Sequence, residues 1–131
     1  MKPMHALAAI LTTALLATSA FADNIRETYT ARLSARDHFN SSGERLTSAA
    51  AIIRQDRANF HKFGKRDAED EADSFFASAH NRELLEKLLE RGSAKKAAIL
   101  AIINGTPLIR VEVCTDARTG GDYIRVSLID N

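Results

Sequence analysis

The chain begins with a segment that has the three successive parts of an export signal, and such a segment is removed from the mature protein. Lys2 gives this segment a positive start, an apolar run extends from Ala6 to Ala20, and the small residues Ala20 and Ala22 follow at the spacing of a cleavage site. The run is about 15 residues long and includes Thr and Ser, so it is shorter than the ~20 apolar residues that span a membrane. The sequence therefore predicts a cleavable signal peptide over residues 1–22.

Cleavage is predicted between Ala22 and Asp23, which leaves residues 23–131 to fold as a single small globular domain. The predicted location is the periplasm or the extracellular space, and no later segment is long and apolar enough to span a membrane. Lys2 is the only Lys or Arg of the signal, which has no Asp or Glu, so cleavage lowers the formal net charge from +1 to zero. This balance argues against nucleic acid as a partner, because nucleic-acid-binding domains usually carry a basic excess.

Cys114 is the only cysteine, so the chain cannot form an internal disulfide and packing has to stabilise it. In an oxidising compartment, a lone thiol is either buried or able to link two chains. The alternating pattern from Leu108 to Cys114 predicts that the thiol lies on the polar face of a strand or at its end. A structural role is favoured over a Cys114-linked dimer, because no CxxC motif or neighbouring histidine indicates a reactive thiol.

Alternating apolar and polar residues predict three strands, over residues 25–33, 108–114 and 123–129. The last two flank a turn rich in Thr and Gly and should form a hairpin. A register that opposes Val113 to Ile124, Val111 to Val126 and Ile109 to Leu128 places these apolar residues on one face and sets Glu112 opposite Arg125. We expect the first strand to pair with the hairpin in a small antiparallel sheet, because an isolated hairpin is marginally stable in water.

Helical periodicity predicts helices over residues 46–63, over residues 81–92 and after a cap at Ser93. The acidic segment at residues 67–76 is predicted to begin another helix, because acids suit the positive end of a helix dipole. The run from Ala97 to Ile103 is apolar on every side, so we expect its helix in the centre of the core. The predicted fold class is α+β, with three or four helices packed on one face of the sheet.

The helix predicted over residues 46–63 carries charged residues beside its apolar stripe. On a helical wheel, Arg57 lies about 40° to one side of the stripe and Asp56 about 60° to the other. A charge this close to apolar packing is destabilising unless it is paired. We therefore expect Asp37 or Glu112 as the partner of Arg57, and a Lys or Arg as the partner of Asp56.

Two interpretations of this helix are open. In the first, Arg54, Arg57 and His61 line one flank, where the arginines hold an anionic group and His61 acts as acid, base or ligand. In the second, these charges form an internal ion-pair network that fixes the helix against the sheet and the loop at residues 37–45. The network is favoured, because the sequence has no GxSxG motif, no HExxH motif and no Cys near a His.

The leading functional hypothesis is an exported, non-enzymatic protein that binds another protein or a small anionic ligand and uses no cofactor. One alternative is a small hydrolase or lyase that uses His61 with Asp56 or His38. Another is a divalent-metal-binding protein that uses His38, His61 and His80, or the acidic run from Asp67 to Asp73. Neither set has the ligand spacing of a zinc motif or of an EF-hand loop.

Overall fold

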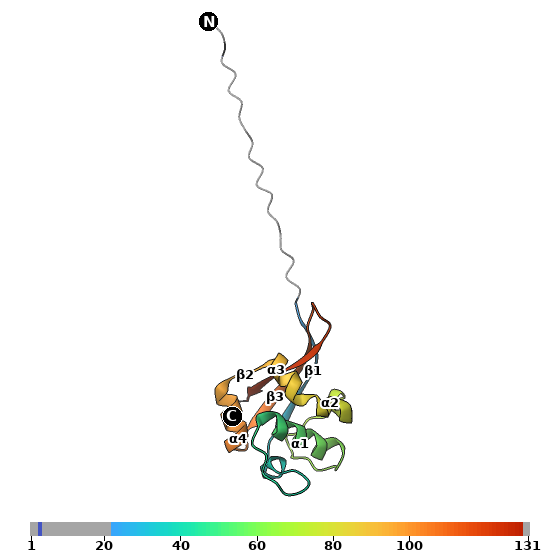
Figure 1. Cartoon of the computed structure of the whole chain (residues 1–131), viewed down its shortest axis with the longest axis vertical. Coiled ribbons are helices and arrows are strands. Elements are labelled where there is room, and N and C mark those ends of the chain that lie inside the picture. The colour runs from blue at the N-terminus through green and yellow to red at the C-terminus, as the bar shows by residue number, and fades with distance from the viewer. Residues whose placement is uncertain (1–2, 4–21, 130–131) are drawn as a thin grey trace.

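A computed structural model describes residue 3 and residues 22–129, so the predicted signal peptide lies outside the described residues apart from positions 3 and 22. The described chain has four α-helices and a four-stranded sheet, which confirms the α+β class (Figure 1). The strands are β1 (Asn24–Arg32), β2 (Ser93–Ala94), β3 (Leu108–Thr115) and β4 (Asp122–Leu128). The helices are α1 (Ala49–His61), α2 (Ala79–Glu83), α3 (Leu85–Arg91) and α4 (Lys96–Asn104), with short 3₁₀ turns η1 (Ala35–His38) and η2 (Phe75–Ala77).

The sheet has the strand order β1-β3-β4-β2. Its three long strands are antiparallel, as predicted, and β3 and β4 pair in the predicted register. Val111 of β3 lies between Tyr29 of β1 and Val126 of β4, and all three side chains are buried against the helices. Glu112 lies opposite Arg125, and their side chains form an ion pair of 3.2 Å. Alternation of period two therefore identified both the buried face and the pairing.

The three predicted strands are antiparallel, but the prediction missed a fourth strand, β2, which pairs with β4 in parallel and makes the sheet mixed. Ser93 belongs to this two-residue strand and does not cap the following helix, whose N-cap is Lys95. The parallel pair forms because α3 ends at Gly92 directly against the backbone of Ile124. A strand of two residues has no alternating pattern from which it could be predicted.

The core lies between the sheet and the helices on one of its faces (Figure 1). Fully buried side chains come from the strands, from the segment directly after β1, from α1, α3 and α4, and from η2. The largest apolar ones are Tyr29, Phe76, Leu33, Ile52, Ile53, Leu85, Leu88, Ile102, Ile109 and Ile124. The prediction that the helix of residues 97–103 lies centrally is wrong, because only Ala98 and Ile102 of α4 are buried. Ile102 is buried there, whereas Leu100 is 47% exposed.

The acidic strap, defined here as residues 67–73, follows the outer edge of β1 and is not helical. The backbone N–H of Glu71 donates to the carbonyl of Thr30 at 2.8 Å, and the Glu71 carboxylate accepts from the Thr30 N–H at 2.9 Å. The Asp70 carboxylate accepts from the Arg32 N–H at 2.8 Å. The helix predicted for this acidic segment is wrong, because its carboxylates bind and cover the backbone groups of an edge strand.

The other helices differ from prediction mainly at their ends. The helix predicted over residues 81–92 is divided at Leu84 into α2 and α3. The helix predicted over residues 46–63 is shorter, and Ser48 caps its start by accepting a hydrogen bond from the Ala51 N–H at 3.2 Å. Within residues 22–129, no helix is long and apolar enough to cross a membrane.

Cys114 is completely buried near the end of β3, opposite Ile25 of β1 and Tyr123 of β4. Its thiol lies 3.9 Å from the carbonyl oxygen of Glu112, to which it can donate a weak hydrogen bond. A thiol with no exposed surface cannot reach a second chain without local opening of the sheet. This burial supports the structural role of Cys114 over an intermolecular disulfide.

Candidate functional site

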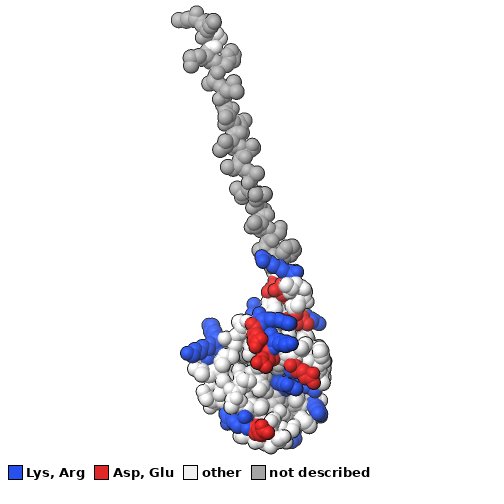
Figure 2. Space-filling model, viewed as in Figure 1, with Lys and Arg blue, Asp and Glu red and all other residues white. Residues whose placement is uncertain are grey.

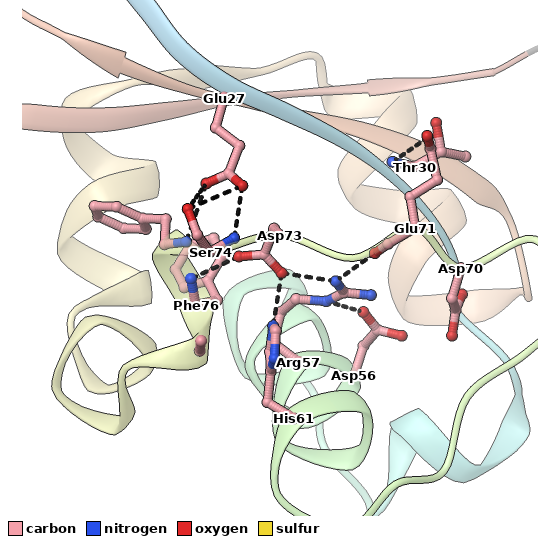
Figure 3. A network of polar contacts seen from close by, with 12 residues as sticks. Glu27, Thr30, Asp56, Arg57, His61, Asp70, Glu71, Asp73, Ser74 and Phe76 are labelled. Carbon is pink, nitrogen blue, oxygen red and sulfur yellow. Dashed lines mark hydrogen bonds and ion pairs between the residues drawn. The ribbon is translucent and has the colours of Figure 1, made fainter.

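Arg57 of α1 points into the protein and is completely buried. Its Nε donates to Asp56 Oδ2 at 2.8 Å, and its Nη1 donates to Asp73 Oδ1 at 2.9 Å and to the Glu71 carbonyl at 3.0 Å (Figure 3). Its Nη2 is buried and has no hydrogen-bond partner among the residues that the structure describes. The guanidinium therefore links α1 to the acidic strap, which in turn is bonded to β1.

Two aromatic rings complete the surroundings of this guanidinium. Its carbon lies 4.2 Å from the centre of the Tyr29 ring and 4.6 Å from the centre of the Phe60 ring. A cation over the face of an aromatic ring is attracted to it, and the attraction is stronger where water is excluded. Carboxylates and ring faces together replace the water that Arg57 loses on burial.

The predicted partners of Arg57 were wrong, whereas an arginine partner for Asp56 is confirmed. Asp37 instead accepts a hydrogen bond from Asn59 Nδ2 at 2.8 Å, and Glu112 pairs with a residue of β4. The physical reason is the path of the acidic strap. Because the strap lies over α1 as an extended segment, its Asp73 carboxylate reaches Nη1 of Arg57, while Asp56 binds Nε.

Asp56 is a buried carboxylate whose pKa is raised above its ordinary value, because burial disfavours the charged form more than Arg57 favours it. The nearby carboxylates of Asp37 and Asp70 raise this pKa further. Arg57 lowers the pKa of this carboxyl group through its charge and its hydrogen bond, and so favours the charged form of Asp56. Asp56 and Arg57 therefore act as one buried unit.

His61 lies at the margin of the network, with 13% of its side chain exposed. Its Nε2 is 2.7 Å from Asp73 Oδ1, the same oxygen that Arg57 contacts, while Asp73 Oδ2 accepts from the Phe76 N–H at 2.6 Å. Both oxygens of Asp73 are thus occupied by structural partners. Neither His61 nor Asp73 lines any of five surface hollows found on the described chain.

His38, the other proposed catalytic histidine, is also buried. Its Nδ1 lies 2.8 Å from the carbonyl of Ser34 and its Nε2 lies 2.7 Å from the carbonyl of Ile102. Both ring nitrogens therefore face backbone acceptors, which fixes η1 to the end of α4. Within the described chain, His61 forms no hydrogen bond with Asp56 or with His38, so neither proposed catalytic pair is assembled.

We expect His61→Ala to lower the free energy of unfolding by about 1–2 kcal/mol, because it removes a hydrogen bond to a buried carboxylate. Thermal and urea unfolding followed by circular dichroism would measure this loss. His80→Ala is the matched control, since His80 is exposed on α2 and should change the stability by less than about 0.5 kcal/mol. Equal stability of the two variants would contradict the structural role of His61.

Arg54, the remaining residue of the predicted flank, is exposed and lines a surface hollow of about 450 Å³. The hollow follows the outer side of α1 between the loop of residues 40–46 and α2. A second hollow of about 440 Å³ shares Asn40, Ser41, Gln55 and Phe63 with the first. We call the two together the α1 groove.

Basic side chains predominate in the α1 groove. Within the described chain, five basic residues and one acidic residue, Glu83, line it, and the basic ones are Arg36, Arg54, Lys62, Lys65 and Arg82. Arg36 pairs with Asp67 at 3.7 Å, and Arg82 donates to backbone carbonyls. The side chains of Arg54, Lys62 and Lys65 form no ion pair or hydrogen bond with any described residue, so they are free to meet an anion.

The sequence missed the α1 groove because its walls come from segments that only the fold brings together. The exposed stripe of α1 gave a partial signal, since Ala51, Arg54, Gln55 and Ala58 recur at helical spacing. The described residues contain no group of three or more His, Cys, Asp or Glu side chains placed to hold a metal ion, and His38, His61 and His80 are not brought together.

Comparison with known proteins assigns no function to the α1 groove. No protein-family model matches the chain. No significant match is found among curated proteins or among solved structures.

Proposed function

We propose that this chain is an exported, non-enzymatic binding protein that holds an anionic partner in the α1 groove. One observation carries the proposal, namely the opposite placement of two arginines that lie on the same helix. Arg57 is fully buried between carboxylates, whereas Arg54 is exposed in a surface groove with no anionic partner among the described residues. The first arginine stabilises the fold, and the second is available for binding.

The charge of the α1 groove is a local feature. The mature chain has no net formal charge, and acidic and basic side chains are intermixed on the face drawn in Figure 2. A groove with a local excess of unpaired cations attracts anions and concentrates them near its walls. Hollows of about 300–1,000 Å³ are typical of small-molecule sites, and each half of the groove falls within this range.

Export is the second part of the proposal, and it rests on the signal peptide predicted over residues 1–22. Asp23, the expected first residue of the mature chain, is held by the β3–β4 hairpin. Its carboxylate accepts from the Ala117 N–H at 3.0 Å and from the Tyr123 hydroxyl. These two hydrogen bonds would hold the new amino-terminal residue against the hairpin after cleavage.

We expect amino-terminal sequencing of the protein, expressed with its own leader and recovered from outside the cytoplasm, to begin at Asp23. Ala22→Leu should slow processing, because the residue before the cleaved bond has to be small. Recovery of the uncleaved chain from the cytoplasm would contradict the export proposal and leave the binding proposal standing.

Anion binding is tested by thermal unfolding with phosphate, citrate and short acidic peptides, because a ligand that binds only the folded state raises its melting temperature. We expect at least one of these anions to stabilise the protein and Arg54→Gln/Lys62→Gln to remove the effect. Lys87→Gln/Arg91→Gln is the matched control, since it removes the same amount of charge from α3. Lys87 lies within α3 as Arg54 lies within α1, and Arg91 lies at the end of α3 as Lys62 lies at the end of α1. Equal stabilisation of both variants, or none of the wild type, would contradict the proposal.

A further inference from the structure

We infer that the partner of the α1 groove is an extended acidic segment of another polypeptide. This inference rests on the proposed function and adds the class of the partner. Three features of the groove support it: its two hollows in series, its exposed aromatic side chains, and its distribution of cations.

The groove is longer than a single small anion requires. Its two hollows share Asn40, Ser41, Gln55 and Phe63, so one continuous depression passes these residues. A small anion would occupy one hollow and leave the other empty. A peptide in an extended conformation advances about 3.3 Å per residue and can therefore follow the depression through both hollows.

Cations line both hollows. Arg54 and Lys62 belong to the first, and Arg36 and Lys65 belong to the second. Of these four, only Arg36 has an ion partner within the described chain. A ligand that satisfies both hollows therefore needs several negative groups spaced along its length, as a segment containing several Glu or Asp residues has.

Two exposed phenylalanines distinguish this groove from a site for an inorganic anion. Phe39 is 41% exposed and Phe63 is 45% exposed, and Phe63 lies where the two hollows meet. Each ring already has a cation over it, Arg45 at 5.6 Å from Phe39 and Lys62 at 5.3 Å from Phe63. Exposed aromatic rings beside basic residues are typical of protein-binding surfaces, where an apolar side chain of the partner covers the ring.

Hydrogen bonds within the chain hold the polar side chains of the groove wall in place. Gln55 donates through Nε2 to Asn59 at 3.0 Å, and Asn40 holds its loop by accepting from the backbone of Ser42 and Glu44. The groove wall is therefore fixed before a partner arrives, which lowers the entropy lost on binding. A peptide is favoured over nucleic acid because acids outnumber the cations beyond the groove, and a phosphate backbone requires a broader basic face.

The test is an NMR titration of the protein with an unstructured synthetic peptide of Glu and Leu, which gives both the affinity and the residues affected. We expect shifts along α1 and the loop of residues 40–46, and weaker binding at higher salt. Arg54→Gln/Lys62→Gln should weaken binding about tenfold, and Lys65→Gln and Phe63→Ser should each weaken it about threefold. Lys87→Gln/Arg91→Gln should leave it unchanged, and the spectra show whether each variant is folded.

Other probes separate this inference from the proposed function. A peptide of Gln and Leu, which lacks the charges, and one of Glu and Ser, which lacks the apolar groups, should both bind more weakly than the Glu and Leu peptide. If citrate binds as tightly as the peptide and does not depend on Lys65 or Phe63, the polypeptide partner is overturned and anion binding stands. Tighter binding of oligothymidine through the same residues would overturn the peptide in favour of nucleic acid. If no anion binds, both proposals fail.

Discussion

Arg57→Leu is expected to lower the free energy of unfolding by about 3–5 kcal/mol, because it leaves two buried carboxylates without their cation. Asp73 has no exposed side-chain surface and Asp56 has 2%, so neither can regain water without local unfolding. Domains of this size are stable by about 5–15 kcal/mol, so a large part of the variant should be unfolded at moderate temperature. Urea unfolding followed by circular dichroism measures the loss.

A double variant tests whether the unpaired carboxylates cause the loss of stability in Arg57→Leu, because it removes the carboxylate of Asp56 as well. Arg57→Leu/Asp56→Leu should be more stable than Arg57→Leu alone, because a buried ion pair replaced by apolar residues of similar size is often close to neutral. Arg54→Leu is the matched control, since it is the same substitution one turn earlier on the exposed side of α1. We expect it to change stability by less than about 0.5 kcal/mol. A similar loss in both single variants would contradict the buried network.

The sheet could be predicted closely because its signals are local and mutually consistent. The alternation of β3 and β4 sets the buried face, and the opposition of Glu112 to Arg125 selects the same register. The acidic strap could not be predicted in the same way. Asp70 and Glu71 suit the start of a helix when only their sequence neighbours are considered. In the fold, however, their carboxylates accept hydrogen bonds from the backbone N–H groups of Arg32 and Thr30, which are distant in the sequence.

The candidate site shows the same limit at the scale of one helix. A helical wheel placed Arg54 and Arg57 on one flank, because they are about 60° apart around the helix axis. In the structure, the acidic strap covers Arg57 and buries it, whereas Arg54, only about 60° away around the helix, stays exposed. The wheel correctly indicated that Arg57 borders the core and needs a partner. It could not show which segment would supply that partner, or that α2 and the loop of residues 40–46 would build a groove beside Arg54.

Gly92→Ala is expected to cost about 3 kcal/mol or more, because the added methyl group would overlap the backbone of β4. A Cβ atom at this position would lie 1.7 Å from the carbonyl oxygen of Ile124 and 2.7 Å from its carbonyl carbon. Real Cβ atoms do not approach other atoms so closely, and overpacking of a folded interior costs about 1–3 kcal/mol even where side chains can adjust. Here the obstructing atoms belong to the backbone of a central strand, so α3 or β4 would have to move.

Gly105→Ala is the matched control, since Gly105 also ends a helix and also has a negative φ. The nearest atom to its added Cβ would be the Ala101 carbonyl oxygen at 3.2 Å, so a shift of a few tenths of an ångström relieves the contact. We expect this variant to lie within about 1 kcal/mol of the wild type, with a melting temperature lower by no more than about 4–8 °C. The gap between the two variants measures the close approach of α3 to β4, which also allows β2 to form. If the two variants have the same melting temperature, α3 does not lie as close to β4 as the 1.7 Å distance between the added Cβ and the Ile124 carbonyl oxygen implies.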